Sequence, residues 1–256
     1  VTSAHYDAGA NLWRIGTEAG EQLSTRFLIT AVGCLSAANV PKIAGLDSFA
    51  GRWYHTGEWP HEGVDFAGKR VGLIGTGSTG IQATPVIAES AAHLTVFQRT
   101  ANYSVPARNA PLTEDFKRYV KRNAKSIRQL MHSTPNGHPF AIEDRSALQV
   151  APEERQALYE AAWEKGGLQF RATFQDLVVS KAANDTAAEF LKSKIRAIVK
   201  DPATAAKLAD IDHPYAAKRP PIDTNYFETF NRSNVALVDL RTTPIERITP
   251  QGIRTT

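Results

Sequence analysis

The stretch VGLIGTGSTGIQ, residues 71–82, decides the fold of this chain. Three of its glycines, Gly75, Gly77 and Gly80, have the spacing G-x-G-x-x-G. In this spacing the first glycine permits a tight turn from strand to helix, the second lets the backbone approach a phosphate, and the third lets helix and strand pack closely. By itself the spacing also fits an ordinary glycine-rich loop, so the neighbouring residues must decide between the two interpretations.

The residues on both sides of the glycines predict a βαβ unit. Residues 69–74 contain a short apolar run with the β-branched Val71 and Ile74, which indicates a buried parallel strand, and residues 81–90 predict a helix. Residues 94–97 predict the second strand. In such a unit the free N–H groups at the start of the helix bind the pyrophosphate of a dinucleotide. The expected cofactor contacts are Gly75, Thr76, Gly77, Ser78, Thr79, Gly80 and Gln82.

The residues after the second strand indicate which dinucleotide binds. An NAD site usually has Asp or Glu there, whereas this chain has Gln98, Arg99 and Thr100. A guanidinium makes bidentate hydrogen bonds to a phosphate, and Thr100 adds a hydroxyl group. NADP(H) is therefore favoured over NAD(H). The alternative is that Arg99 is a solvated surface arginine.

Composition narrows the classes of function. The chain has 256 residues, 42% of them apolar, which is enough for a core in one or two domains. The net charge of +4 comes from scattered basic residues, so nucleic-acid binding is not expected. No apolar run approaches the ~20 residues that span a bilayer, and the seven histidines lack ligand spacing, so neither a membrane nor a metal partner is expected. Cys34 is the only cysteine, which excludes an intramolecular disulfide and fits a cytoplasmic location.

Both ends of the chain predict β-structure. Residues 11–15 and 25–32 predict the strands of a hairpin, the second of them buried. Residues 247–256 predict another hairpin, whose second strand has only begun, and the chain starts at Val1 rather than Met. We therefore expect a segment of a longer protein.

Helices are predicted between the βαβ unit and the C-terminal strands. Thr113 is the expected N-cap of the first helix, and Pro152 is the expected first residue of the second. The helices are predicted at residues 113–131, 152–166, 186–200 and a short stretch after Asp201, and strands return at 235–239 and 245–248. Helices in a row do not continue a βαβ alternation, so residues 105–212 are expected to be a helical insertion.

A second motif, FAGRWYHTGEWP at residues 49–60, precedes the glycines. It resembles, position for position, the fingerprint F-x-G-x-x-x-H-T-x-x-W-P of the Baeyer–Villiger monooxygenases. Related flavin N- and S-oxygenases share its first half but usually lack the Trp-Pro end. The matching residues are Phe49, Gly51, His55, Thr56, Trp59 and Pro60, and further matches follow the family order at residues 31–33, 75–80, 97–100, 105–109, 218–220 and 230–232.

The resemblance implies an α/β fold with one dinucleotide-binding domain for FAD and a Rossmann-like one for NADP, which has a parallel sheet and a helical insertion. On that map residues 1–33 are the tail of an FAD-domain segment, residues 34–104 and 213–256 are the two parts of the NADP-binding domain, and residues 105–212 are the insertion. The glycine motif for FAD is absent, so FAD is expected to be bound mostly by parts that this chain lacks. Activity of the chain alone is therefore left open, and the rest of the FAD domain is an expected partner.

The resemblance also implies a reaction. NADPH reduces the flavin, which reacts with O2 to give a C4a-peroxide, and this peroxide converts a ketone to an ester or lactone. By match to the family, Arg219 is the expected catalytic residue beside the peroxide anion, and Lys218 is expected to hold the 2′-phosphate with Arg99 and Thr100. His55 is expected to couple cofactor binding to domain position.

Each of these roles has an alternative in which the residue has no part in catalysis or cofactor binding. Arg219 could pair with a carboxylate such as Asp223, Lys218 could be a solvated charge, and His55 could be a buried linker histidine. For the whole chain, the alternatives are a flavin N- or S-oxygenase and, in isolation, a non-catalytic NADP-binding module. A dehydrogenase without flavin lacks support, because no Tyr-x-x-x-Lys pattern is present.

Overall fold

The computed structural model describes residues 1–33, 35–135 and 137–256. Cys34 lies outside the described residues, and so do the expectations that rest on it. The chain divides into two compact units, one of residues 1–41 and 53–61 and the other of residues 42–52 and 62–256. Each unit is described by itself.

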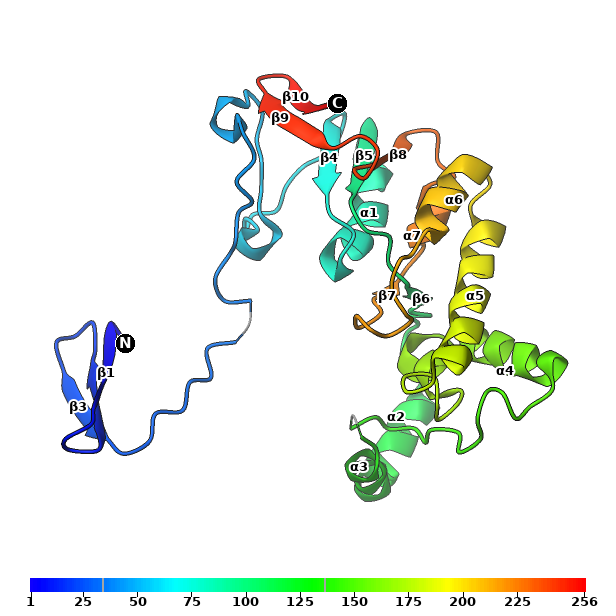
Figure 1. Cartoon of the computed structure of the whole chain (residues 1–256), viewed down its shortest axis with the longest axis horizontal. Helices are drawn as coiled ribbons and strands as arrows, with labels where there is room; N and C mark the ends of the chain where they lie inside the picture. Colours follow the sequence, from blue (N-terminus) through cyan, green and yellow to red (C-terminus); the bar gives the residue numbers. More distant parts are fainter. Residues whose placement is uncertain (34, 136) are drawn as a thin grey trace. The chain divides into compact units, whose positions relative to one another are not determined.

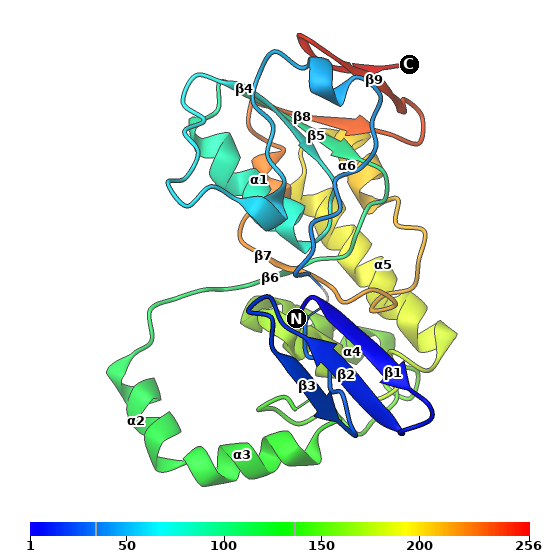
Figure 2. The same ribbon diagram turned by 90° about the vertical axis from the view of Figure 1, so that its left-hand side faces the viewer.

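The first unit contains a three-stranded antiparallel sheet with β2 (Leu12–Gly16) between β1 (Ser3–Asp7) and β3 (Gln22–Thr25). Tyr6 and Trp13 pack across β1 and β2 with ring centroids 5.4 Å apart. The same sheet is drawn in blue in Figure 2.

The prediction of a buried strand at residues 25–32 is wrong. The strand that pairs with β2 is β3, and it ends at Thr25. Phe27 and Ile29 are 76% and 88% exposed, and residues 26–33 form no strand. The physical reason is that an apolar run specifies a surface to be buried, whereas a strand also needs a neighbour for its backbone hydrogen bonds. Within this unit the pairing stops at Thr25, whose hydroxyl bonds the backbone of Phe27.

The second unit contains the βαβ unit that the glycine motif predicts. Strands β4 (Arg70–Ile74), β5 (His93–Gln98) and β8 (Val235–Asp239) form a parallel sheet in that order, and α1 (Ser78–Ser90) connects β4 to β5. Figure 1 shows α1 beside this sheet. The predicted strands are confirmed within one residue at each end, and the helix begins three residues earlier than predicted. The chain has the α/β, Rossmann-like fold that its sequence indicates.

The core joins the sheet to the helices. Ile81 on α1 and Leu94 and Val96 on β5 are fully buried, and they belong to one apolar cluster with Leu191 and Ile195 of α5 (Lys181–Ile198). Each such side chain contributes about 1.5–3 kcal/mol to stability relative to its exposed state. The start of α1 is therefore held firmly against the ends of β4 and β5.

Helices occupy most of the region between β5 and β8. They are α2 (Glu114–Arg122), α3 (Ala124–Ser133), α4 (Pro152–Lys165), η3 (Gly167–Ala172), α5, α6 (Pro202–Ala209) and α7 (Tyr226–Thr229). Two short strands, β6 (Val105–Pro106) and β7 (Ile222–Asp223), pair in parallel. In the sequence, β6 precedes the helices α2 to α6 and β7 follows them.

The prediction of one helix over residues 113–131 is wrong. Thr113 caps the helix as expected, with its hydroxyl accepting from Phe116 N at 3.2 Å. Asn123 then ends α2, because its backbone leaves the helical region (φ −105°, ψ 14°) and its side-chain amide donates to Tyr119 O at 2.8 Å. The amide competes with the helical ladder for that carbonyl, which is the known reason that Asn disfavours helix interiors.

The later helices agree better with the sequence. Helix α4 begins at Pro152 and stops before Gly166, where a Cβ atom would lie 2.4 Å from the side chain of Arg108. Helix α5 begins at Lys181 rather than residue 186, because Ser180 caps it. The short helix expected after Asp201 is α6, which Asp201 caps, and β9 (Ile245–Thr249) and β10 (Gly252–Thr255) form the predicted hairpin.

Candidate functional site

The glycine turn between β4 and α1 has the geometry that its spacing predicts. Gly75 has a φ of +107°, a region that other residues rarely adopt, and its N–H bonds Phe97 O at 3.0 Å. A Cβ atom at Gly80 would lie 2.2 Å from the carbonyl oxygen of Gly75, so a side chain there would collide with the turn. At Gly77 a Cβ atom would meet no protein atom within 4 Å. The turn is therefore tightly packed on its protein side and open at Gly77.

The start of α1 can bind an anion. Gly77 is the N-cap, and the first turn contains no acidic residue. Ser78 and Thr79 are exposed there. Unpaired backbone N–H groups and the positive end of the helix dipole favour a phosphate at such a position. The donors present therefore fit the pyrophosphate of a dinucleotide.

A hydrogen bond joins this turn to the residues that follow β5. Buried Thr76 donates its hydroxyl to Thr100 O at 2.7 Å. Arg99 is exposed, and in the part of the chain that the structure describes no carboxylate forms an ion pair with it. Gln98 is buried and donates its amide to Lys207 O at 2.9 Å, so it has a packing role. The structure thus brings Gly75–Gly80 together with Arg99 and Thr100 at the carboxyl ends of two parallel strands.

Lys218 and Arg219 lie in the segment between α6 and β7. Both side chains are exposed, and among the described residues neither forms an ion pair. The alternative in which Arg219 pairs with Asp223 is therefore not found. Gln82, in the first turns of α1, donates its side-chain amide to Ile222 O at 3.1 Å. This bond connects the glycine helix to β7, which begins three residues after Arg219.

Asp223 has partners that its sequence position did not reveal. Its carboxylate accepts hydrogen bonds from the hydroxyl of Ser104 and from Tyr226 N, the latter at 3.0 Å. Burial raises the pKa of Asp223 above its ordinary value, and the bonds from Ser104 and Tyr226 oppose that shift. No sequence motif predicts that this carboxylate bonds Ser104, because Ser104 and Asp223 are 119 residues apart.

Asp239 at the end of β8 is also buried. Burial by itself would raise its pKa, but hydrogen bonds from the backbone and guanidinium of Arg241 outweigh it and lower the pKa of Asp239. Arg241 also bonds Asp210 at 2.7 Å. The carboxyl end of β8 therefore carries a paired carboxylate, unlike the basic, unpaired end of β5.

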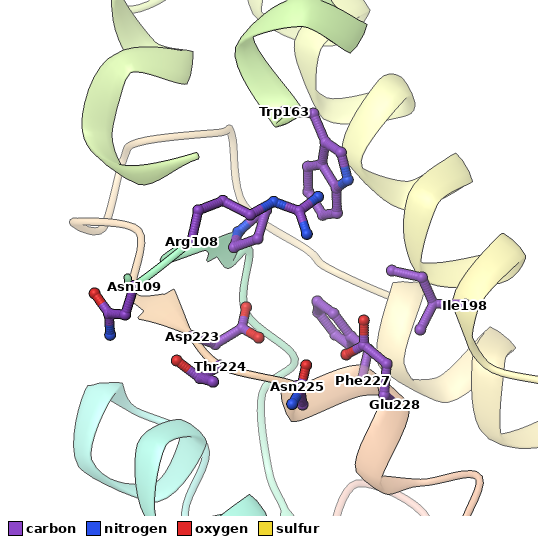
Figure 3. Close-up of a pocket in the computed structure, with 10 residues that line it drawn as sticks. Arg108, Asn109, Trp163, Ile198, Asp223, Thr224, Asn225, Phe227 and Glu228 are labelled. Carbon is purple, nitrogen blue, oxygen red and sulfur yellow. The ribbon is translucent and has the colours of Figure 1, made fainter. Parts of the chain in front are cut away.

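A pocket of about 260 Å³ lies near β6, β7 and α7. Figure 3 shows Arg108, Asp223 and Glu228 among the side chains that line it, with Trp163 from α4 and Ile198 from α5. Arg108 has a φ of +51° and pairs with Glu164 at 3.3 Å. None of the residues predicted to bind the cofactor lines this pocket.

The fingerprint residues have different local roles. Phe49 lies over Gly51, where a Cβ atom would come within 2.6 Å of the Phe49 ring, so a larger residue there would require the ring to shift. His55 is half-buried, and its Nδ1 accepts from Gly57 N at 3.1 Å to start a turn of 3-10 helix, Thr56–Glu58. The rings of Tyr54 and Trp59 lie 5.8 Å apart, next to Pro60. The contacts of residues 54–59 describe a compact turn within the first unit.

Among residues 1–33, 35–135 and 137–256, no three His, Cys, Asp or Glu side chains are grouped so that they could hold a metal ion. Within the same residues, no helix combines the length and the apolar character needed to cross a membrane.

Comparison with known proteins gives the family. No protein-family model matches the chain. It is 47% identical to cyclohexanone 1,2-monooxygenase from Acinetobacter sp over 99% of its own length and 47% of the relative's. It is 46% identical to a Baeyer–Villiger monooxygenase from Pseudooceanicola batsensis, over 99% of the chain and 46% of that relative. The chain thus spans about half the length of these relatives.

A solved structure agrees with these relatives. OTEMO in complex with FAD and NADP superposes on the whole chain with a TM-score of 0.95 at 42% identity, and the match covers 49% of OTEMO. The agreement extends over the described fold, and the resemblance drawn from residues 49–60 is confirmed. The chain belongs to the Baeyer–Villiger monooxygenase family.

Proposed function

We propose that this chain is the NADP-binding half of an NADPH- and FAD-dependent monooxygenase that converts a ketone to an ester or lactone with O2. The observation that carries the proposal is the open glycine turn at α1 with Arg99 and Thr100 beside it, in a chain that matches Baeyer–Villiger monooxygenases over its whole length. In the proposed whole protein, residues 1–33 complete the FAD domain, residues 34–104 and 213–256 form the NADP domain, and residues 105–212 are its insertion.

The donors of this chain would hold NADP(H) by its phosphates. The N–H groups of residues 76–80 would bind the pyrophosphate, and Arg99, Thr100 and Lys218 would bind the 2′-phosphate. The absence of a carboxylate at position 99 removes the repulsion that an NAD-type site has toward that phosphate.

Arg219 is the proposed catalytic residue. NADPH supplies a hydride and FAD the activated oxygen when both are bound, and in the proposed whole protein FAD is held mainly by residues outside this chain. A guanidinium stays charged at neutral pH, so Arg219 would stabilise an anion without giving up its proton. The exposed, unpaired state of Arg219 among the described residues supports this role, because no carboxylate competes for it.

His55 is proposed to couple cofactor binding to the position of the domains. Its Nδ1 accepts from Gly57 N, so the other ring nitrogen, Nε2, is the one proposed to contact a ligand. A cytoplasmic location, a small ketone as substrate and the remaining FAD domain as partner are parts of the same proposal.

Titration of the chain with NADPH and NADH tests the proposal. We expect binding of NADPH to be at least about tenfold tighter, because a phosphate in a charge-assisted contact contributes about 1.5–3 kcal/mol. Equal affinity for the two nucleotides would refute the 2′-phosphate site. In the whole protein, products from a cyclic ketone, an amine and a sulfide separate a ketone monooxygenase from an N- or S-oxygenase.

A further inference from the structure

The segment that carries Lys218 and Arg219 is bounded on each side by a buried polar side chain that hydrogen-bonds backbone. Asn184 of α5 binds the segment at Tyr215, and Asp223 ends it at β7. We propose that Asn184 and Asp223 are positioning residues, which hold the backbone around Lys218 and Arg219 so that Lys218 faces the 2′-phosphate and Arg219 faces the reacting anion. This inference rests on the proposed function, in which those cations act.

At the entry of the segment, the side-chain amide of Asn184 uses both of its N–H donors. Asn184 is 5% exposed. Its Nδ2 donates to Leu177 O at 2.6 Å and to Tyr215 O at 2.8 Å, and its Oδ1 accepts from Tyr215 N at 2.9 Å. Both backbone polar groups of Tyr215 are therefore held by one side chain.

The ring of Tyr215 adds to this hold. It is buried and packs edge-on against Phe170 at 5.6 Å and against Tyr103 at 5.7 Å. Tyr215 lies three residues before Lys218, so the entry to the basic segment is fixed in the core.

The Asp223 end is held through side chain and backbone. Asp223 is 5% exposed, and its carboxylate accepts from Ser104 and Tyr226 N. Its backbone oxygen accepts from Ala107 N at 2.7 Å, and Pro221 O accepts from Val105 N at 3.1 Å. The exit of the segment is thereby tied to β6 and to α7.

Between these two ends the backbone has little freedom. Ala216 has a φ of +63°, and Ala217 N donates to Pro214 O at 3.2 Å. Pro220 and Pro221 follow Arg219 directly, and proline fixes φ. The bond from Gln82 to Ile222 O then ties the segment to the first turns of α1.

The side chains of Lys218 and Arg219 are exposed, whereas the backbone around them is held. A backbone that is already ordered in the free protein loses little conformational entropy when the ligand binds, so more of the contact energy appears as affinity. Asn184 binds the backbone of Tyr215 at the entry of the segment, and Asp223 ties its exit to Ser104 and Tyr226, so the loss of either is expected to loosen the segment.

The test uses the 256-residue chain and three variants. Asn184→Ala removes both hydrogen bonds to Tyr215 and the one to Leu177 O. Ser104→Ala is the milder variant, which removes one bond from Asp223 and serves if Asn184→Ala does not fold. Thr186→Ala is the matched control, because Thr186 lies on the same helix and its hydroxyl bonds Tyr159 at 2.8 Å and Ala183 O at 2.7 Å, both outside the segment.

Two readouts are needed. The first is the ratio of the affinities for NADP+ and NAD+. We expect Asn184→Ala to weaken NADP+ about tenfold, to leave NAD+ within about twofold, and to add nothing in a Lys218→Ala background, as residues that act through one another do. The second readout is native-state cleavage by trypsin after Lys218, identified by mass, which we expect to become about tenfold faster in Asn184→Ala as local opening becomes easier.

The outcomes separate the two proposals. If the parent chain does not prefer NADP+, the proposed function fails, and the trypsin readout alone judges whether Asn184 holds the segment. If the parent prefers NADP+ but folded Asn184→Ala and Ser104→Ala keep both the preference and the slow cleavage, the positioning role is overturned. An equal effect of Thr186→Ala would also overturn it, since the loss would then be general to α5.

Discussion

The hydroxyl of Thr76 donates a 2.7 Å hydrogen bond to the backbone carbonyl of Thr100. Thr76 lies in the glycine turn after β4, and Thr100 follows Arg99 at the end of β5. One partly buried hydrogen bond thus sets the spacing between the proposed pyrophosphate contacts and the proposed 2′-phosphate contacts.

Thr76→Val tests this bond. It keeps the branched shape but leaves the carbonyl of Thr100 without its partner, so we expect a loss of about 1 kcal/mol in the free energy of unfolding and several-fold weaker NADPH binding. Thermal unfolding and fluorescence titration measure the two effects. Thr95→Val on β5 is the control, because among the described residues Thr95 makes no side-chain hydrogen bond. Equal effects of both variants would mean that the bond has no special role.

Gly80→Ala and Gly77→Ala form a matched pair. At Gly80 the added methyl group would lie 2.2 Å from Gly75 O, and we expect a loss of roughly 1–3 kcal/mol in the free energy of unfolding. At Gly77 the added methyl meets no protein atom, so we expect near-parent stability with weakened NADPH binding. Denaturant unfolding and titration measure both. Retained binding by Gly77→Ala would contradict the close approach of a phosphate.

Arg99→Ala tests the choice of cofactor. We expect affinity for NADPH to fall about 10- to 100-fold, because a charge-assisted contact to phosphate contributes about 1.5–3 kcal/mol, and affinity for NADH to change little. Isothermal titration measures both nucleotides. Arg70→Ala is the control, because Arg70 is exposed at the start of β4, at the other end of the strand from the glycine turn. If NADPH and NADH lose affinity equally, Arg99 does not contact the 2′-phosphate.

Arg219→Ala in the whole protein tests the catalytic proposal. A cation about 4 Å from an anion, at an effective dielectric near 20, contributes about 4 kcal/mol, which corresponds to roughly a thousandfold in rate. We expect flavin reduction by NADPH to continue and ester formation to fall by about that factor. Stopped-flow absorbance and product analysis measure the two steps, with Arg128→Ala on α3 as the control. A normal yield of ester would remove Arg219 from the mechanism.

The buried carboxylates Asp223 and Asp239 are expected to change the free energy of unfolding with pH in opposite directions. Burial raises the pKa of Asp223, so the folded state holds its proton more tightly, and the free energy of unfolding falls as the pH rises above the unfolded value near 3.8. For Asp239 the pKa is lowered, so its contribution is present above 3.8 and is lost as the pH falls through the folded pKa.

Asp223→Asn and Asp239→Asn separate these two contributions. We expect the stability of Asp223→Asn relative to the parent to improve with rising pH, and that of Asp239→Asn to worsen. Urea unfolding from pH 3 to 7 measures both. The same slope for the two variants would contradict the assigned directions.

Some of the fold and part of the site follow from local sequence. The turn at Gly75 requires a positive φ, and the packing at Gly80 requires the absence of a Cβ atom. Glycine meets both requirements, so glycines at this fixed spacing predict the turn from the sequence. The caps at Thr113 and Asp201 are local in the same way, because each side chain bonds the backbone three residues ahead. Such features can be predicted from one sequence because their partners lie within a few residues.

By itself, the sequence determined the βαβ unit and the family, and it supplied the residues that we propose contact the cofactor. Only the tertiary structure decided that residues 26–33 form no strand, that Asn123 ends α2, and that Asn184 and Asp223 hold the segment around Lys218. The physical reason is distance along the chain. A hydrogen bond such as that between Ser104 and Asp223 joins residues 119 positions apart, and no local pattern of apolarity or charge specifies which distant group a buried polar atom will meet.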